Sequence, residues 1–177
     1  MQGEGTPLDG VEMREHLAEV SELLGTEGPH HVLIVVGGAL LALHELRDTT
    51  YDIDSISELD QEFRDAVAVV AERHGLATDW LNDRARGFTP ATFRIEDCQP
   101  LHESPRLLVL GAPFDQVFLM KLYRNDAQDF EDMIRIWPLC GFASAQQVVD
   151  LFFDAYPHAP NDEHLVDLVR QIASAAE

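Results

Sequence analysis

Lysine is almost absent from this chain of 177 residues. Of its twelve basic residues eleven are arginine, and the only lysine is Lys121. Thirty-two acidic residues stand against these twelve, which gives a formal net charge of -20. A field of this sign repels polyanions and slows their association, so the composition argues against a broad intrinsic nucleic-acid surface. It is compatible with a local basic patch or with a basic partner protein.

Long apolar runs are also lacking. No run approaches the ~20 residues that a membrane-spanning helix needs, and residues 1–5 lack the basic and apolar regions of a signal peptide. We therefore expect a cytoplasmic protein that does not associate with a membrane. Cysteine is scarce as well, and Cys98 and Cys140 belong to no Cys-x-x-Cys pair. Neither a zinc site nor a disulfide framework is indicated, and two buried free thiols are expected.

The chain is long enough for one well-packed domain, and it has no internal repeat, low-complexity tract or linker. We predict a main domain over 1–142 and a helical extension over 143–177 that packs on the same core. Residues 1–8 are expected to be disordered, and Ser57 to cap a helix. The periodicity predicts helices over 8–24, 39–47, 58–73, 111–124, 129–137, 144–156 and 161–175, and strands over 32–36, 51–56, 91–95 and 106–110.

Two glycines and two aspartates form the most informative motif. The first predicted strand ends at Gly37-Gly38, a short helix follows, and Asp52 and Asp54 come next in an alternating segment. Side chains at i and i+2 leave the same face of a strand, so these aspartates point together while Ile53 faces the core. Two carboxylates roughly 6 Å apart repel by about 3 kcal/mol at an effective dielectric near 20, so they need a cation, a shared proton or generous solvation. Magnesium, which binds one or two carboxylates together with phosphate oxygens, meets that need.

The glycines and the nearby arginines suggest where a phosphate binds. Gly37-Gly38 lets the backbone turn tightly and lets a phosphate approach main-chain N–H groups. Arg47 is a candidate partner of the aspartates or of a bound phosphate, and Arg84 and Arg86 are candidates for reaching a triphosphate or a nucleic-acid backbone. Simpler interpretations stay open: two solvated acids at a strand end, a strand-to-helix turn, an exposed Arg47, and arginines that offset nearby acids.

Lys121 lies within an apolar helical stretch, Phe118 to Tyr123, and is therefore a poor candidate for a surface residue. The alternative is that its stem is buried and its ammonium group reaches solvent. On the next predicted helix Asp129 and Asp132 are three residues apart and share one flank. A lysine and an acidic pair thus follow the glycine and aspartate motif.

Together these residues resemble the nucleotidyltransferase-fold superfamily, the polymerase-beta-like proteins. Its signature is an apolar strand ending in Gly-Gly or Gly-Ser, a short helix, and then Asp-x-Asp or Asp-x-Glu. Within the superfamily the chain is most similar to small AbiEii-related nucleotidyltransferase-like proteins of prokaryotic toxin-antitoxin systems. The matching stretches lie within 33–137 and are 37–44, 49–54, 79–82, 119–122 and 129–132. The resemblance implies an α+β nucleotidyltransferase fold, with a mixed sheet of four or five strands flanked by helices and a helical C-terminal cap.

The resemblance also implies roles for individual residues. Asp52 and Asp54 bind Mg²⁺ or Mn²⁺, and Gly37-Gly38 shapes the cradle for the phosphates of a nucleoside triphosphate. Lys121 contacts those phosphates, and Asp129 completes the acidic site. The sequence departs from the family at Gln128, where a basic residue is usual, and Asp132 is an alternative to Asp129.

The implied function is magnesium-dependent transfer of a nucleoside monophosphate from a nucleoside triphosphate to an RNA, such as transfer RNA, or to a protein, in a toxin-antitoxin system. The alternative is a catalytically inactive protein of the same fold that serves as an antitoxin or partner-binding subunit. The charge of -20 favours a basic cognate partner in that case.

Overall fold

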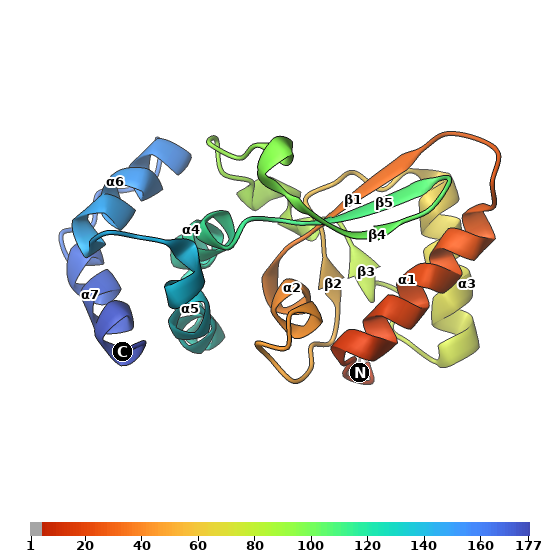
Figure 1. The fold of residues 1–177 in the computed structure, drawn as a ribbon, viewed down its shortest axis with the longest axis horizontal. Helices are drawn as coiled ribbons and strands as arrows, with labels where there is room; N and C mark the ends of the chain where they lie inside the picture. Colours follow the sequence, from red (N-terminus) through yellow and green to blue (C-terminus); the bar gives the residue numbers. More distant parts are fainter. Residues whose placement is uncertain (1–4) are drawn as a thin grey trace. The chain divides into compact units, whose positions relative to one another are not determined.

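The computed structural model describes residues 5–177, which divide into two compact units (Figure 1). The first unit extends to Gly87 and also contains Cys98–Ala112, and the second unit consists of Phe88–Asp97 and Pro113–Glu177. The predicted domain boundary after residue 142 falls inside the second unit and stays a prediction. The fold class is α+β, as predicted, with seven α-helices and five strands over the described residues. No helix in this part of the chain is long and apolar enough to cross a membrane.

A three-stranded sheet in the order β1–β5–β4 forms the centre of the first unit (Figure 1). β1 (His31–Val35) and β5 (Leu107–Gly111) are parallel and almost entirely apolar, as expected of strands that are covered on both faces. β4 (Gln99–Glu103) runs antiparallel to β5 at the edge, and its register shifts between Pro100 and His102. Proline has no N–H to give to a ladder, so an edge strand is the position that tolerates it.

Two short strands form a second sheet. β2 (Ile53–Asp54) and β3 (Leu81–Asn82) are parallel. An antiparallel bridge between Val35 and Ser55 connects β2 to the end of β1. The strand predicted over 51–56 is therefore too long, since Tyr51 is exposed and only the part from Ile53 onward pairs. The single sheet of four or five strands that we predicted is divided into these two sheets.

Two helices of the first unit, α1 and α2, precede Asp52 and Asp54 in the sequence. α1 (Gly10–Leu24) begins at Asp9, whose side chain forms a capping box with Glu12. α2 (Gly37–Leu43) follows β1 directly and is buried over most of its length. The prediction of disorder over 1–8 is wrong for Leu8, which is buried and exchanges two backbone hydrogen bonds with Thr50, and residues 1–4 lie outside the described part.

The third helix, α3 (Gln61–His74), packs against α1 (Figure 1). Asp60 caps its N-terminus by accepting from the Phe63 N–H at 2.9 Å. The predicted cap, Ser57, is wrong because its hydroxyl oxygen instead accepts from the Ile34 N–H. The helix ends at Gly75 in the left-handed conformation, where the sequence predicts its end.

The strand predicted over 91–95 does not form. Its residues make turns, with Phe93 donating to the carbonyl of Pro90, and a 3₁₀ turn follows at Ile95–Asp97. Another 3₁₀ turn covers Arg84–Phe88. The antiparallel partner of β5 is instead β4, in a segment where the sequence predicts no strand. The local alternation of side chains does not reveal which segment has a pairing partner.

The second unit is mainly helical and contains α4 (Phe114–Arg124), α5 (Ala127–Cys140), α6 (Ala145–Ala155) and α7 (Leu165–Ala175). All four helices were predicted, with differences at their ends. α4 begins three residues later than predicted and α7 four residues later, while α5 begins two residues earlier and ends three residues later. α4 packs on α5 and α6, and α7 packs on α5 and α6. The shared core is apolar and contains Phe118, Met133, Ile136, Val148, Val169 and Ile172.

The two cysteines form no disulfide within the described residues, as predicted, although both are half-buried rather than buried. Burial, with the nearby charge of Asp115, raises the pKa of Cys140 to about 12. A thiol with so high a pKa is a poor nucleophile at neutral pH.

Candidate active site

The glycine turn lies between β1 and α2. Val36 is extended, and Gly37 has a φ of +65°, which residues with a side chain rarely adopt. A Cβ built on Gly37 would have the Asp54 carboxylate as its nearest neighbour, with Oδ2 at 3.7 Å. The turn is also tied to β2 because the Val36 N–H donates to the Asp54 carbonyl at 3.0 Å. The structure therefore brings Gly37 and Asp54 together.

The two aspartates flank Ile53. Ile53 is fully buried, and its N–H donates to the Trp80 carbonyl at 2.6 Å, so the predicted core anchor is confirmed. Asp52 and Asp54 are both half-buried. The structure gives the Asp54 carboxylate no hydrogen-bond or ion-pair partner among residues 5–177.

Asp52 is in an environment that disfavours its charge. Burial raises the pKa of Asp52 above its ordinary value and the charge of Asp54 raises it further, while Arg84 opposes the rise. Its Oδ2 accepts from Arg84 Nη2 at 2.8 Å and lies 3.5 Å from Asn82 Nδ2. An additional cation beside the two carboxylates would relieve the repulsion that remains.

Asn82 and Arg84 both lie beside the Asp52 carboxylate. Asn82 is buried in β3, directly opposite Asp54 in the strand register, and its Oδ1 accepts from the Arg84 N–H and Nε. Arg84 also forms an ion pair with Asp79 at 3.2 Å. The sequence left open whether Arg84 reaches a phosphate or offsets nearby acids. In the structure it pairs with two acids, Asp52 and Asp79. Arg86 likewise pairs with Glu58 at 3.2 Å.

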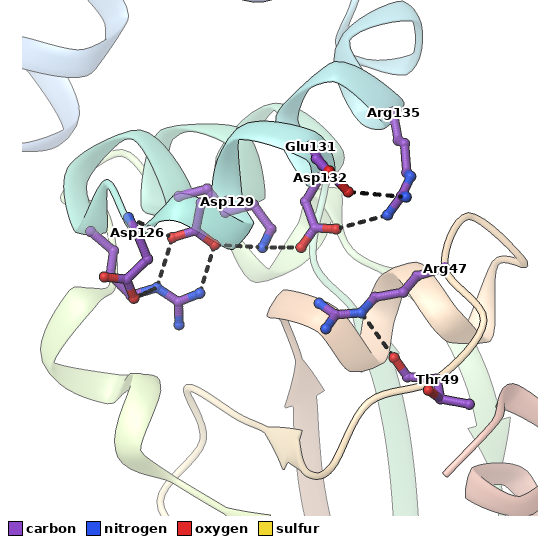
Figure 2. A network of polar contacts seen from close by, with 9 residues as sticks. Arg47, Thr49, Asp126, Asp129, Glu131, Asp132 and Arg135 are labelled. Atoms are coloured by element: carbon purple, nitrogen blue, oxygen red, sulfur yellow. Dashed lines mark hydrogen bonds and ion pairs between the residues drawn. The ribbon is translucent and has the colours of Figure 1, made fainter. Parts of the chain in front are cut away.

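Arg47 lies beside the second glycine. A Cβ on Gly38 would come within 2.8 Å of Arg47 Nη1, so the absence of a side chain at position 38 makes room for this guanidinium group. Arg47 Nε donates to the Thr49 carbonyl at 2.9 Å (Figure 2). The first unit thus contains Gly37 and Gly38 at the start of α2, Arg47 after that helix, and the two aspartates at β2.

Lys121 belongs to the second unit, where it is buried between two carboxylates of α5. Its Nζ donates to Asp129 Oδ1 at 2.9 Å and to Asp132 Oδ2 at 2.8 Å. Figure 2 shows Asp129 and Asp132 on the same helix, with the dashed contacts that link them. The three side chains are each at most 4% exposed, so the prediction that Lys121 is not a surface residue is confirmed.

Asp129 is also held by Arg124, which donates to both of its carboxylate oxygens at 2.9 and 2.6 Å. Burial alone would raise the pKa of Asp129, but the hydrogen bond from Arg124 and the charge of Lys121 outweigh it, so the pKa is lowered. Its Oδ2 accepts from the Asp126 N–H as well, at the start of α5. These contacts tie α4 to α5, and the predicted convergence of Lys121 and Asp129 with Asp52 and Asp54 stays a prediction.

A family model for nucleotidyltransferases of unknown function (DUF6036) matches residues 12–173. The chain belongs to this family. No curated protein and no solved structure matches the chain. Membership in the DUF6036 nucleotidyltransferases supports the resemblance that the glycine and aspartate motif indicates, at the level of the superfamily. The match spans both units.

The sequence assigns no role to Asn82, and for Arg84 it leaves open whether the side chain reaches a phosphate or offsets nearby acids. Asn82 is the last residue of the short strand β3 and Arg84 comes two residues later. The register that sets Asn82 opposite Asp54 depends on pairing between segments about thirty residues apart. A local pattern carries no information about such pairing. The available signal was chemical: an amide and an arginine directly after a short apolar stretch.

Proposed function

We propose that the protein is a magnesium-dependent nucleotidyltransferase that moves a nucleoside monophosphate from a nucleoside triphosphate to an RNA, such as transfer RNA, or to a protein. The observation that carries the proposal is the pair Asp52 and Asp54, placed beside the Gly37 turn in a member of a nucleotidyltransferase family. The glycine turn and the acidic pair come from separate segments, which makes a chance combination of solvated acids a weaker explanation.

The donor atoms of this site fit Mg²⁺ or Mn²⁺. Both aspartates offer carboxylate oxygens, which these cations prefer, and the mutual repulsion of the two carboxylates favours binding a divalent ion. A cation that binds Asp52 would displace Arg84 from this carboxylate. Arg84 would still have an acidic partner, because it also pairs with Asp79. When bound, the cation neutralises phosphate charge and lowers the pKa of an attacking hydroxyl group.

The other residues bind and orient in this proposal. Gly37 keeps the space beside Asp54 free of a side chain, and Arg47 beside Gly38 offers a guanidinium group to a phosphate. Lys121 is the proposed second phosphate ligand and Asp129 the later acidic residue, with Asp132 as the alternative. For Lys121 this role requires that a phosphate compete with the two carboxylates that hold its ammonium group.

A toxin-antitoxin setting, with AbiEii-related proteins as the nearest group, completes the proposal. The net charge of -20 favours a protein acceptor over an RNA, because a polyanion approaches such a surface slowly. A basic cognate toxin is the acceptor that this charge fits best.

The proposal is tested by incubating the protein with each α-labelled nucleoside triphosphate, Mg²⁺ or Mn²⁺, and either transfer RNA or the product of a neighbouring gene. We expect label transfer that depends on the metal and falls by at least about a hundredfold in Asp52→Asn and in Asp54→Asn. Asp150→Asn, an exposed aspartate of α6, is the matched control and should retain full transfer. Absence of transfer to every acceptor, or equal transfer in all variants, would contradict the proposal.

One contact favours the second candidate, an inactive binding protein. The Arg84 guanidinium group pairs with the Asp52 carboxylate in the place of a metal ion, as expected of a site that no longer binds a metal. Under this alternative a basic partner co-purifies with the protein, and its binding is unaffected by Asp52→Asn. Transfer that is lost in Asp52→Asn would exclude it.

A further inference from the structure

A cluster of two histidines and one glutamate lies where α1 meets the end of α3, away from the glycine turn in sequence. His16 is buried on α1, Glu19 is one turn further along the same helix, and His74 is the last residue of α3. One ligand atom from each residue can be chosen so that all three atoms lie within 4.8 Å of one another. We propose that His16, Glu19 and His74 form a transition-metal site, with Zn²⁺ the cation that the donor set fits best.

The geometry requires little movement to bind an ion. His74 Nε2 and Glu19 Oε2 are 2.6 Å apart, and the rings of His16 and His74 have centroids 4.5 Å apart. Tetrahedral Zn²⁺ with bonds of about 2.0–2.1 Å holds its ligand atoms on the order of 3.4 Å from one another. Small rotations of the exposed His74 and of Glu19 bring the cluster to that spacing.

The donor set decides which cation binds. Two imidazole nitrogens and one carboxylate oxygen suit zinc and its neighbours in the first transition row, whereas Mg²⁺ prefers oxygen donors alone. Three protein ligands leave a fourth position for water. The site is therefore distinct in chemistry from the carboxylate pair of Asp52 and Asp54.

Neighbouring groups orient the ligands. Arg73 Nη1 donates to Glu19 Oε1 at 2.7 Å, which fixes the carboxylate and leaves Oε2 toward His74. His16 packs edge-on against the buried Trp80, with ring centroids 5.6 Å apart. Such hydrogen bonds and packing around the ligands are what hold metal-binding side chains in place. Glu12 and Glu15 on α1 add negative charge close enough to act on His16.

His16 of the cluster also contacts Trp80, a residue that is hydrogen-bonded to β2. Trp80, which His16 contacts, accepts the hydrogen bond of the Ile53 N–H. A metal at the cluster would hold α1, the end of α3 and the segment before β3 together within the first unit.

The test is a Co²⁺ and Zn²⁺ titration of the full-length protein without a polyhistidine tag. The parent for all measurements carries Asp52→Asn and Asp54→Asn, so that binding at the carboxylate pair does not contribute. We expect one Co²⁺ per chain, with visible absorption bands of a low-coordinate nitrogen and oxygen site, and displacement by Zn²⁺. His74→Ala and Glu19→Gln should each weaken binding at least about tenfold.

His158→Ala, an exposed histidine of the second unit, is the matched control and should bind as the parent does. Because His74 is exposed, its replacement leaves the buried core intact, and far-ultraviolet circular dichroism confirms folding of each variant. No Co²⁺ bands in the folded parent, or equal affinity in the parent and His74→Ala, would overturn the proposal and leave a plain hydrogen bond between His74 and Glu19. Neither result bears on nucleotidyl transfer, because the parent lacks the proposed magnesium ligands.

Discussion

At the scale of single residues, Gly37 is a position of the candidate site whose backbone restricts the choice of amino acid. Its φ of +65° disfavours any Cβ, although the nearest atom to a Cβ, Asp54 Oδ2, is at an ordinary contact distance of 3.7 Å. Gly37→Ala should therefore lower the free energy of unfolding by about 1–2 kcal/mol through the backbone alone. Gly87→Ala, where a Cβ meets nothing within 4 Å, is the control and should change it by less than about 0.5 kcal/mol. Urea titrations measure both, and equal losses would show that the turn does not need glycine.

A second prediction at this scale concerns the effect of Asp52 ionisation on stability. Because its pKa in the folded protein is raised above the ordinary value of 3.8, ionisation of Asp52 destabilises the folded state. This destabilisation is absent below the ordinary pKa and complete above the raised one. Without divalent metal, Asp52→Asn should thus raise the melting temperature at pH 7, and the gain should disappear near pH 3. A variant that is less stable than the wild type at pH 7 would mean that the contact with Arg84 outweighs burial and the charge of Asp54.

At the scale of elements, the ion network between α4 and α5 is the main polar contact in the second unit. Lys121→Met leaves Asp129 and Asp132 buried without the ammonium group, and should destabilise this unit by about 3–5 kcal/mol. Adding Asp132→Asn should recover part of the loss, since it removes one of the two carboxylate charges that faced the ammonium group. The exposed control Arg170→Met, which breaks the pair with Asp167, should change stability by less than about 1 kcal/mol.

Thermal and urea unfolding of the three variants measure this network. Loss of less than about 1 kcal/mol in Lys121→Met would show that Lys121 is not held by the two aspartates in solution. Transfer activity of this variant is informative only at a temperature where it remains folded, because the same lysine is the proposed phosphate ligand.

The elements also show why part of the fold could be predicted from the sequence and part could not. β1 and β5 are short apolar runs, and α5 and α6 start at side-chain caps, so local chemistry is sufficient for each. β4 contains a proline and polar residues, and its existence depends on pairing with β5. The segment 91–95 has a strand-like pattern but no pairing partner and turns instead.

The same distinction holds for the candidate site. Gly37, Asp52 and Asp54 are recognisable because their order and spacing resemble the motif of the nucleotidyltransferase-fold superfamily, and the structure brings Gly37 and Asp54 together. The contacts of Asn82 and Arg84 with Asp52 could not be predicted, because only the register of β2 with β3 brings these side chains to Asp52. For Lys121 the apolar surroundings in the sequence predicted burial, while its partners depend on how α4 packs on α5.

At the scale of the whole molecule, the charge of -20 affects the two proposed ligands of the site in opposite ways. A strongly acidic protein attracts divalent cations and repels a triphosphate, so nucleotide binding should depend on metal that accompanies it. Arg47 and Lys121 are the cations that the proposal assigns to the phosphates. The family to which the chain belongs is described as nucleotidyltransferases of unknown function, and the central claim beyond this membership is that Asp52 and Asp54 bind a metal with a nucleotide.

That claim is tested most directly by calorimetric titration of the full-length protein with non-hydrolysable analogues of the four nucleoside triphosphates, with and without Mg²⁺. We predict binding of at least one analogue that weakens at least about tenfold without Mg²⁺, and equally in Asp52→Asn and Asp54→Asn. Asp65→Asn, an exposed aspartate of α3, should bind as the wild type does. Binding that is the same in all variants, or no binding of any analogue with Mg²⁺ present, would contradict the assignment of Asp52 and Asp54.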